Sequence, residues 1–487
     1  MTDADPEGLR LPIKLDATSN GEFEPIPLGR LEREANRLAL ESADRAARRT
    51  GTSRRRFLMS AAGAACTLLA FDRAQAAAGR TGSRHELPPE AEFENDLAES
   101  LVGGEEFIFD VQGHFVDPTG AWLQDLAADA RPFSSMPKAA CVPQDGSRDY
   151  LRCLGPDEFV KDVFLDSDTD MMVLSFVPSA PNAEPVTIEA ADAVRRIVDE
   201  LEGTQRLLLH GRVNPNQAGD VERMPELAER WGISAWKTYT QFGPDGVGYF
   251  LDDPDTGIPF VEQARATGVK VICVHKGLPF GPESYRHSQC ADIGRIARRY
   301  PDVTFIVYHS GFVAGQPERA FAPGAGRDGI DTLIQSMVDN DLGPGSNVYA
   351  ELGSTWRYLM RDPDSAAHAL GKLLKYMGED NVLWGTDSIW YGSPQDQIQA
   401  FRSFQIAREL RERHGYPRIT PEIRAKVFGL NATRPYRIDA EEMRLRAGGD
   451  RMAARRAAYR EAPDPHFRTH GPRTRREFLA LLRSGVH

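Results

Sequence analysis

Several polar residues able to bind a metal ion or to move a proton stand at or near the ends of short apolar runs. His275 and His309 close two of these runs, KVICVH and VTFIVYH, and Asp387 closes a third, NVLWGTD. His114 comes shortly after a fourth run, FIFDV, and Lys237 lies within a fifth, SAWKTY. Imidazole and carboxylate groups together are a suitable ligand set for Zn²⁺ and similar ions. We therefore expect a divalent ion bound by His114, His275 and Asp387, zinc first, with manganese or another divalent ion as the alternative.

The same runs predict the elements that hold this site. They are apolar throughout, as strands covered by helices are, and helical patterns separate most of them. Strands that alternate with helices form a parallel sheet, and eight such units close into an α/β fold, a (β/α)8 barrel of the TIM type. The carboxyl ends of the strands lie on one rim, so residues distant in sequence meet there. The expected strands are residues 107–111, 171–177, 207–213, 234–239, 270–275, 303–309, 347–352 and 381–387.

Two connections are much longer than the others. Residues 115–165 and 310–346 each follow the end of an expected strand. Barrel enzymes place their active-site loops at this end of the strands. We expect both connections to lie near the site. The alternative is that they are insertions with no role in it.

The N-terminal part of the chain has the three parts of an export signal. Residues 53–58 read SRRRFL, residues 60–71 form an apolar run, and residues 74–76 are an A-x-A cleavage pattern. The motif resembles the twin-arginine signal, whose translocon exports folded proteins. This predicts a periplasmic or extracellular protein that uses the twin-arginine export machinery and loses residues 1–78. The alternative is an internal basic helix of a cytosolic protein, which the long charged stretch 1–52 favours.

Composition and charge limit the remaining possibilities. The formal net charge of −12 argues against a general nucleic-acid-binding role. No run reaches the roughly 18 apolar residues of a membrane span, and no lipid-attachment pattern precedes Cys66, so no stable membrane anchor is expected. The sequence leaves open whether the protein forms a homodimer.

Seven other histidines lack a partner pattern and are expected at the surface: His85, His287, His368, His414, His466, His470 and His487.

We divide the chain accordingly into four parts. Residues 1–78 are the charged region and signal peptide, and residues 79–104 are a linker. Residues 105–437 form the barrel. Residues 438–487 are an Arg-rich extension, helical or partly disordered, whose basic patches are expected to be solvated surface rather than a binding site.

The order of the site motifs resembles the amidohydrolase superfamily, in its amidohydrolase-related branch, which also includes decarboxylases and lactonases. The matching pieces are QGH at 112–114, His275, YHSG at 308–311, GTD at 385–387 and the helix VFGLNA at 427–432. In that branch the first strand ends in H-x-H or E-x-H, and later strands supply two histidines and an aspartate. The resemblance covers about residues 105–437 and implies a metal-dependent enzyme.

One residue departs from this pattern. Gln112 stands where the resemblance places the first ligand, and a neutral amide is a poorer zinc ligand than imidazole or carboxylate. The ion could be held weakly, could recruit Asp110, or could be absent. Metal-independent hydrolysis of a lactone therefore remains an alternative.

The resemblance implies a metal-dependent hydrolase that acts on a small carboxylate-bearing substrate or a cyclic amide or lactone through metal-activated water. We expect Asp387 to move the proton and His309 to polarise the substrate carbonyl. Lys237 or Arg357 would hold a substrate carboxylate, and a modified Lys237 bridging two metals is the alternative. Tyr239 and Trp356 would line the pocket. A decarboxylase of an aromatic or unsaturated acid, and a non-catalytic exported binding barrel, are the other functions left open.

Overall fold

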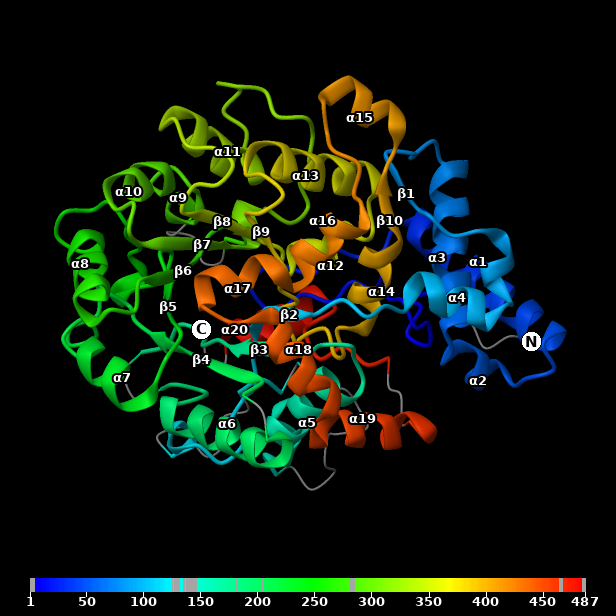
Figure 1. Cartoon of the computed structure of the whole chain (residues 1–487), viewed down its shortest axis with the longest axis horizontal. Helices are drawn as coiled ribbons and strands as arrows, with labels where there is room; N and C mark the ends of the chain where they lie inside the picture. The colour runs from blue at the N-terminus through cyan, green and yellow to red at the C-terminus, as the bar shows by residue number, and fades with distance from the viewer. Residues whose placement is uncertain are drawn as a thin grey trace.

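A computed structural model shows eight parallel strands in one sheet, surrounded by helices (Figure 1). It describes residues 5–124, 126, 132–134, 136, 147–180, 183–203, 205–279, 285–463 and 467–483. The strands pair in sequence order, each parallel to the next. They are β2 (Phe109–Gly113), β3 (Met171–Leu174), β4 (Leu207–Arg212), β5 (Ala235–Tyr239), β6 (Val271–His275), β7 (Thr304–Tyr308), β8 (Val348–Glu351) and β9 (Val382–Leu383).

Backbone hydrogen bonds between the first and last strands close the barrel. The amide of Val111 donates to the carbonyl of Trp384 over 3.1 Å, and the amide of Asp387 donates to the carbonyl of Gln112 over 3.0 Å. A parallel bridge joins Gly113 to Ser388 one step further on. The predicted (β/α)8 barrel is therefore confirmed, and each strand overlaps the run expected for it.

An outer ring of helices covers the strands, which explains why the strands are apolar on both faces. The interior is filled by side chains that include Phe109, Met171, Ile306 and Tyr308, and Tyr436 belongs to the same cluster. The helices of the barrel are α5 (Pro156–Val160), α6 (Ile188–Glu202), α7 (Met224–Trp231), α8 (Gly257–Thr267), α9 (Tyr285–Ser288), α10 (Ile293–Arg299), α11 (Ile330–Asp339), α12 (Thr355–Leu359), α13 (Pro363–Tyr376), α14 (Gln395–Ser403), α15 (Arg408–His414), α16 (Pro421–Ala425) and α17 (Asn431–Tyr436).

The N-terminal helices form a separate group beside the barrel, in blue at the right of Figure 1. They are α1 (Arg30–Arg49), α2 (Arg54–Leu58), α3 (Ala61–Ala77) and α4 (Asn95–Val102), and α3 packs against α1 and α4. The strand β1 (Ser83–His85) pairs antiparallel with β10 (Phe404–Ile406) and ties this group to the barrel.

The expected signal segment lies inside this helical group. The apolar run forms α3, of which Leu68 and Phe71 are buried, and the Phe57–Leu58 pair of the twin-arginine motif is buried as well. A run of alanine and leucine makes a good buried helix for the same reason that it makes a good export segment, because it carries almost no polar side chains. Among the helices that the structure describes, none combines the length and apolarity needed to cross a bilayer. Export and cleavage after Ala76 remain predictions.

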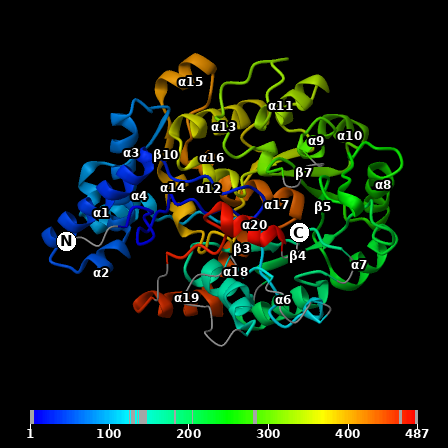
Figure 2. The same cartoon turned by 180° about the vertical axis from the view of Figure 1, so that it is seen from behind.

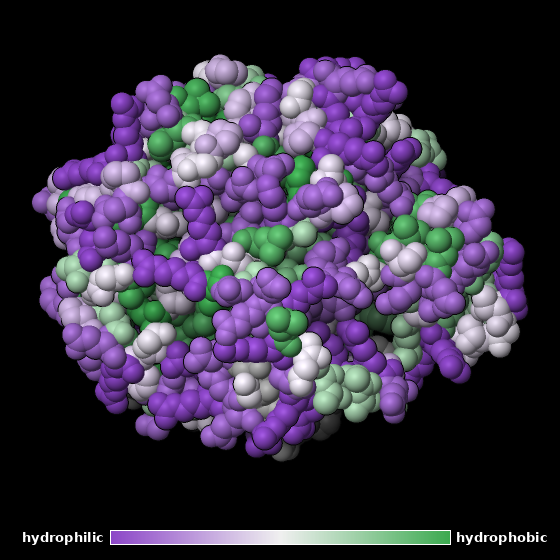
Figure 3. Space-filling model, in the orientation of Figure 1, coloured by the Kyte–Doolittle hydropathy of each residue, from purple (hydrophilic) through white to green (hydrophobic). Residues whose placement is uncertain are grey.

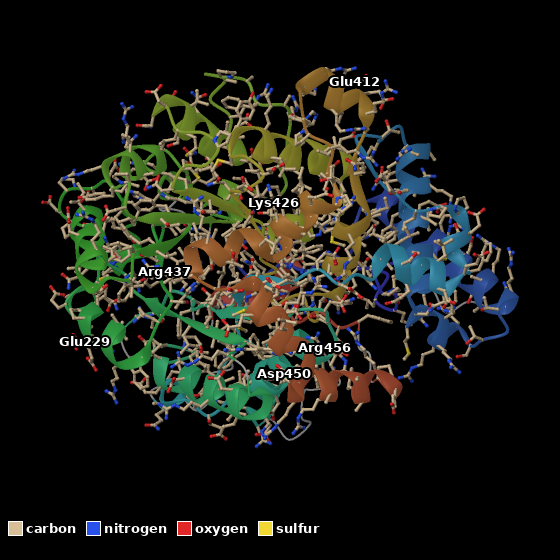
Figure 4. The ribbon with its side chains drawn as sticks, viewed as in Figure 1. Glu229, Glu412, Lys426, Arg437, Asp450 and Arg456 are labelled. Atoms are coloured by element: carbon tan, nitrogen blue, oxygen red, sulfur yellow. The ribbon has the colours of Figure 1, made fainter. Side chains whose placement is uncertain are left out.

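The C-terminal extension is helical over much of its described length, with α18 (Ala440–Gly449), α19 (Arg451–Glu461) and α20 (Arg475–Arg483). Its basic residues are not all solvated. Arg456, labelled with Asp450 in Figure 4, donates to the carbonyl oxygens of Phe164 and Thr169. Asp450 in turn accepts two hydrogen bonds from the buried Arg206, at 2.7 and 2.8 Å.

One of the histidines expected at the surface lies elsewhere. His470 is 1% exposed, because its backbone amide and that of the next residue both donate to the carbonyl of Trp390 and carry the segment into the interior. The expectation of a surface position was therefore wrong. His466 and His487 lie outside the described residues.

The face shown in Figure 3 is largely hydrophilic, with small, separated hydrophobic patches. Large apolar side chains exposed by more than half are few among the described residues: Ile197, Val247 and Leu445. Isolated apolar residues of this kind are normal on a protein surface.

Candidate active site

An N-terminal segment covers the carboxyl ends of the strands. Residues 11–23 precede α1 and run as a dark blue trace from the helical group toward the barrel (Figures 1 and 2). Leu11, Ile13 and Leu15 alternate along it and are 0–1% exposed. Asp16, which follows Leu15, forms an ion pair with Arg357 at 2.6 Å. These residues are therefore buried as fully as those of the barrel core.

The C-terminal extension holds this segment in place. The hydroxyl of Thr469 donates to Asp16 over 3.0 Å and contacts the hydroxyl of Thr18 at 2.8 Å. The amide of Ser19 donates to the carbonyl of Pro472 over 2.9 Å. The two ends of the chain thus meet over the barrel.

Two histidines and one glutamate meet beneath the segment. His275 is the last residue of β6, His309 follows β7, and their rings lie 4.5 Å apart between centroids. Glu22 reaches them from the N-terminal segment, with one oxygen 3.4 Å from Nδ1 of His275 and the other 3.7 Å from Nε2 of His309. Both histidines are 0% exposed. Together these three residues form a group whose ligand atoms all lie within 4.8 Å of one another.

The protonation of His309 follows from its contacts. Its Nδ1 lies 2.6 Å from the carbonyl oxygen of Gly353, which can only accept, so Nδ1 carries the proton. Burial lowers the pKa of His309 to about 4. The ring is therefore neutral near pH 7, and Nε2 presents a lone pair toward Glu22. Burial also holds the pKa of His275 well below its usual value.

A second group surrounds Asp387, which follows β9. One of its oxygens accepts a hydrogen bond from the side-chain amide of Gln112 at 3.0 Å and lies 3.1 Å from Nε2 of His114. The other accepts from Ser354 at 2.5 Å and from Asn20 at 2.8 Å. Burial by itself would raise the pKa of Asp387, but these hydrogen bonds and the neighbouring imidazoles outweigh it and hold the pKa well below its usual value.

The ligands expected from sequence are thus divided between two neighbouring groups. His275 lies with His309 and Glu22, whereas His114 lies with Gln112 and Asp387. Asn20 connects the groups, since its amide also donates to an oxygen of Glu22 over 2.5 Å.

The backbone at this rim adopts an uncommon conformation. His309, Ser354 and Asp387 have positive φ angles of 63°, 54° and 59°. Such a φ costs a side-chain-bearing residue on the order of 1–3 kcal/mol and persists only where the surroundings enforce it. These conformations cluster at the strand ends that carry the polar groups, as they do in functional sites.

Lys237 supplies a buried positive charge near both groups. It is 0% exposed, lies 3.6 Å from the ring centroid of Tyr308, and its Nζ has no hydrogen-bond partner among the described residues. Burial lowers its pKa to about 8. An unpaired buried ammonium group is costly unless an anion compensates it, which makes Lys237 a candidate anchor for a substrate anion.

The other predicted site residues serve neighbouring structure. The Asp110 carboxylate accepts hydrogen bonds from the hydroxyl and the backbone amide of Thr386 and from the backbone amide of Gln112. Arg357 is engaged by Asp16, and Trp356 donates to the carbonyl of Gln397 and packs against Phe401 and Phe404. Tyr239 lies closer to the chemistry, because its ring stacks on His275 with centroids 4.7 Å apart.

An aromatic stack borders the second group. The Trp390 ring lies 5.8 Å from that of His114 at an interplanar angle of 23°, and Phe133 lies 6.4 Å beyond Trp390 at 11°. Phe133 belongs to the long connection 115–165, so this loop does approach the site as expected.

Sequence reasoning missed four polar residues of this region. Glu351 ends β8, accepts from the amides of His309 and Gly353, and has its pKa raised to about 8 by burial. Its position at a strand end was a usable signal, and Ser354 follows shortly after. Asn20 and Glu22 offered no such signal in the sequence, because they lie in a segment that was expected to be removed.

The chain matches the family model described as Amidohydrolase over residues 109–438. No curated protein matches the chain.

Solved structures resemble it distantly. An uncharacterised TIM-barrel protein from Bordetella bronchiseptica is 14% identical with a TM-score of 0.40, covering 70% of this chain and 99% of its own. A 5-carboxyvanillate decarboxylase from Sphingomonas paucimobilis is 14% identical with a TM-score of 0.39, covering 68% and 99%. A 2,6-dihydroxybenzoate decarboxylase from Rhizobium is 16% identical with a TM-score of 0.40, covering 68% and 99%. Likenesses at this level decide neither the reaction nor the substrate.

Proposed function

The chain belongs to the amidohydrolase family and is an amidohydrolase-related enzyme, and from this premise we propose that it is a metal-dependent hydrolase of a small carboxylate-bearing or cyclic substrate, an amide or a lactone. The observation that carries the proposal is that two neutral imidazoles and, in the neighbouring group, an ionised carboxylate lie at one buried rim. His275 and His309 are the imidazoles, and Asp387 is the carboxylate.

The residues present fit a divalent ion. The Nε2 atom of His309 is a buried acceptor with no hydrogen-bond partner among the described residues, and its Nδ1–H is held by the carbonyl of Gly353. Metal-binding histidines are oriented in this way, with the second nitrogen hydrogen-bonded to a carbonyl or carboxylate. When bound, a divalent ion lowers the pKa of water and polarises a carbonyl group.

This geometry changes the role expected for His309. Polarising a substrate carbonyl would require a proton on Nε2, but the proton is on Nδ1. We therefore assign His309 to the metal instead.

Asp387 is the group that moves the proton. Its low pKa keeps it ionised near neutral pH, so it can accept a proton from water and pass it to the leaving group. Ser354, Asn20 and Gln112 fix its orientation by hydrogen bonds. Lys237 would hold the substrate carboxylate, since its ammonium group is buried without a hydrogen-bond partner among the described residues.

A second candidate is decarboxylation of an aromatic acid. The parallel rings of Phe133, Trp390 and His114 favour it, because a flat aromatic substrate packs well against such a stack. The same Lys237 would then orient the carboxylate that is lost.

Metal analysis combined with substrate screening tests the proposal. The full-length protein, purified without chelator, should contain about one divalent ion per chain and hydrolyse members of a panel of lactones and cyclic amides. Activity should disappear with chelator and return with zinc or manganese. Asp387→Asn should abolish turnover. Release of CO₂ from hydroxybenzoates without hydrolysis of the other panel members would instead establish the decarboxylase, and activity that persists in chelator would refute the metal-dependent mechanism.

A further inference from the structure

We propose that Glu22, which lies outside the barrel, is a ligand of the divalent ion and takes the place of the ligand that the first strand lacks at Gln112. The ion would be held by Glu22, His275 and His309. This inference rests on the proposed metal-dependent function, and it assigns part of the active site to the N-terminal segment.

The distances between the three residues fit a metal site better than a hydrogen-bonded cluster. Glu22 is 3.4 Å from Nδ1 of His275 and 3.7 Å from Nε2 of His309, both longer than the roughly 2.7–3.2 Å of an N–H···O hydrogen bond. Zinc binds nitrogen and oxygen at about 2.0–2.2 Å in tetrahedral geometry, which places neighbouring ligand atoms about 3.4 Å apart. The two separations from the Glu22 carboxylate, one to each of its oxygens, are close to that spacing, and the three ligand atoms all lie within 4.8 Å of one another.

The chemistry of the facing atoms points the same way. Nε2 of His309 presents a lone pair because Nδ1 donates to Gly353, and a carboxylate oxygen of Glu22 is also an acceptor. Two acceptors that face each other in a buried site repel unless a proton or a cation lies between them. At 3.7 Å a shared proton would be poorly placed, whereas a cation would satisfy both atoms.

The charge balance gives a third reason. The side chain of Glu22 is only 13% exposed, and Asp387 lies close enough to interact with it electrostatically. Asn20 donates to both carboxylates, but an amide carries no net charge. Burial and the neighbouring Asp387 raise the pKa of Glu22 well above its usual value, while Lys237 lowers it, so the carboxylate needs a further cation beside it to be ionised, and a divalent ion would supply that charge.

The segment that carries Glu22 is held firmly enough to present a ligand. Asp16 is bound by Arg357 and Thr469, and Ser19 is tied to the C-terminal extension at Pro472. Because the ligand sits on this segment, metal binding and docking of the segment should stabilise each other.

Zinc binding by the full chain is the direct test, with Glu22→Gln compared against wild type. The matched control is Glu24→Gln, the same substitution two residues on, at a side chain that is 53% exposed and 3.5 Å from Arg475. Loss of a residue that only supports a ligand costs about 10–100-fold in metal affinity. We therefore expect Glu22→Gln to weaken zinc binding by at least about 100-fold by titration calorimetry, and Glu24→Gln to leave it unchanged. Glu22→Asp should restore part of the affinity.

Two further measurements separate ligation from misfolding. The visible spectrum of the Co²⁺-loaded protein reports ligand geometry and should change in Glu22→Gln but not in Glu24→Gln. Limited proteolysis of residues 11–29 in metal-free protein should be the same for wild type and Glu22→Gln, and should slow on adding zinc only in wild type.

The outcomes are distinct. If wild type and Glu22→Gln bind zinc equally, Glu22 is no ligand while the metal-dependent function stands. If wild type itself binds no divalent ion, the proposed function fails. If the secreted mature chain begins at Ala77 and still binds zinc with the affinity of the full chain, the assignment of Glu22 is refuted as well.

Discussion

Asp168 offers a stability prediction that can be worked out from the structure. This carboxylate lies between the barrel and the C-terminal extension and is 18% exposed. It accepts hydrogen bonds from Arg402 of α14 at 2.5 Å, from Arg460 of α19 at 2.6 Å and from Gln395 at 2.9 Å. Burial would raise its pKa, but the two guanidinium groups outweigh burial and lower the pKa from 3.8 to about 2. Asp168→Asn removes this charge and should destabilise the fold.

The magnitude follows from the pKa shift. A shift of one unit corresponds to about 1.4 kcal/mol, so the ionised Asp168 contributes roughly 2.4 kcal/mol to the free energy of unfolding at pH 7. Because the pKa is lower in the folded state, this contribution is complete above about pH 5 and is lost as the pH falls toward 2. About half should remain at pH 3. For 487 residues that unfold as one unit, 2.4 kcal/mol corresponds to a decrease in Tm of about 2 °C.

Thermal unfolding of wild type and Asp168→Asn between pH 7 and pH 3 measures this difference. The control is Asp149→Asn, which removes a 64% exposed carboxylate 3.9 Å from Arg152 and should change Tm by well under 1 °C. A difference between wild type and Asp168→Asn that is absent at pH 7, or that grows on acidification, would refute the reasoning.

Three other changes have defined outcomes. Replacing Arg54 and Arg55 together by lysine should trap the precursor in the cytoplasm, and an unchanged periplasmic yield after fractionation would contradict export by the twin-arginine route. Gln112→His would place an imidazole where the amide now donates to Asp387, and should raise zinc affinity by titration calorimetry; equal affinities would mean that this position does not face the metal. Gly385→Ala would bring a Cβ atom within 1.6 Å of a carboxylate oxygen of Glu351, so we expect at least about 10-fold lower turnover, with wild-type turnover as the contrary result.

The barrel and the positions of its rim residues followed from local pattern. Apolar runs alternating with helical segments are a property of neighbouring residues, and the barrel places every strand end on one rim. His275, His309 and Asp387 could therefore be assigned to the site without knowing their distances. Glu351 obeyed the same rule at the end of β8 and could have been found in this way.

The detailed grouping of these side chains was decided by the tertiary structure. That His309 lies with His275 and Glu22, while His114 lies with Asp387, depends on side-chain directions and on hydrogen bonds such as that from His309 to Gly353. Such contacts join residues more than 40 positions apart and leave no periodic trace in the sequence.

The N-terminal segment shows where the local sequence stops being informative and the folded structure is needed. Its local sequence shows a basic motif, an apolar run and a cleavage pattern, and these features suit an export signal and a buried helix equally well, since both require a short run without charges. Only the folded chain brings Asn20 and Glu22 to the strand ends of the barrel, Asn20 in contact with Asp387 some 367 residues away. Sequence therefore determined the scaffold and its rim, because those depend on local periodicity. The tertiary structure decided what covers the rim, because that depends on packing between the two ends of the chain.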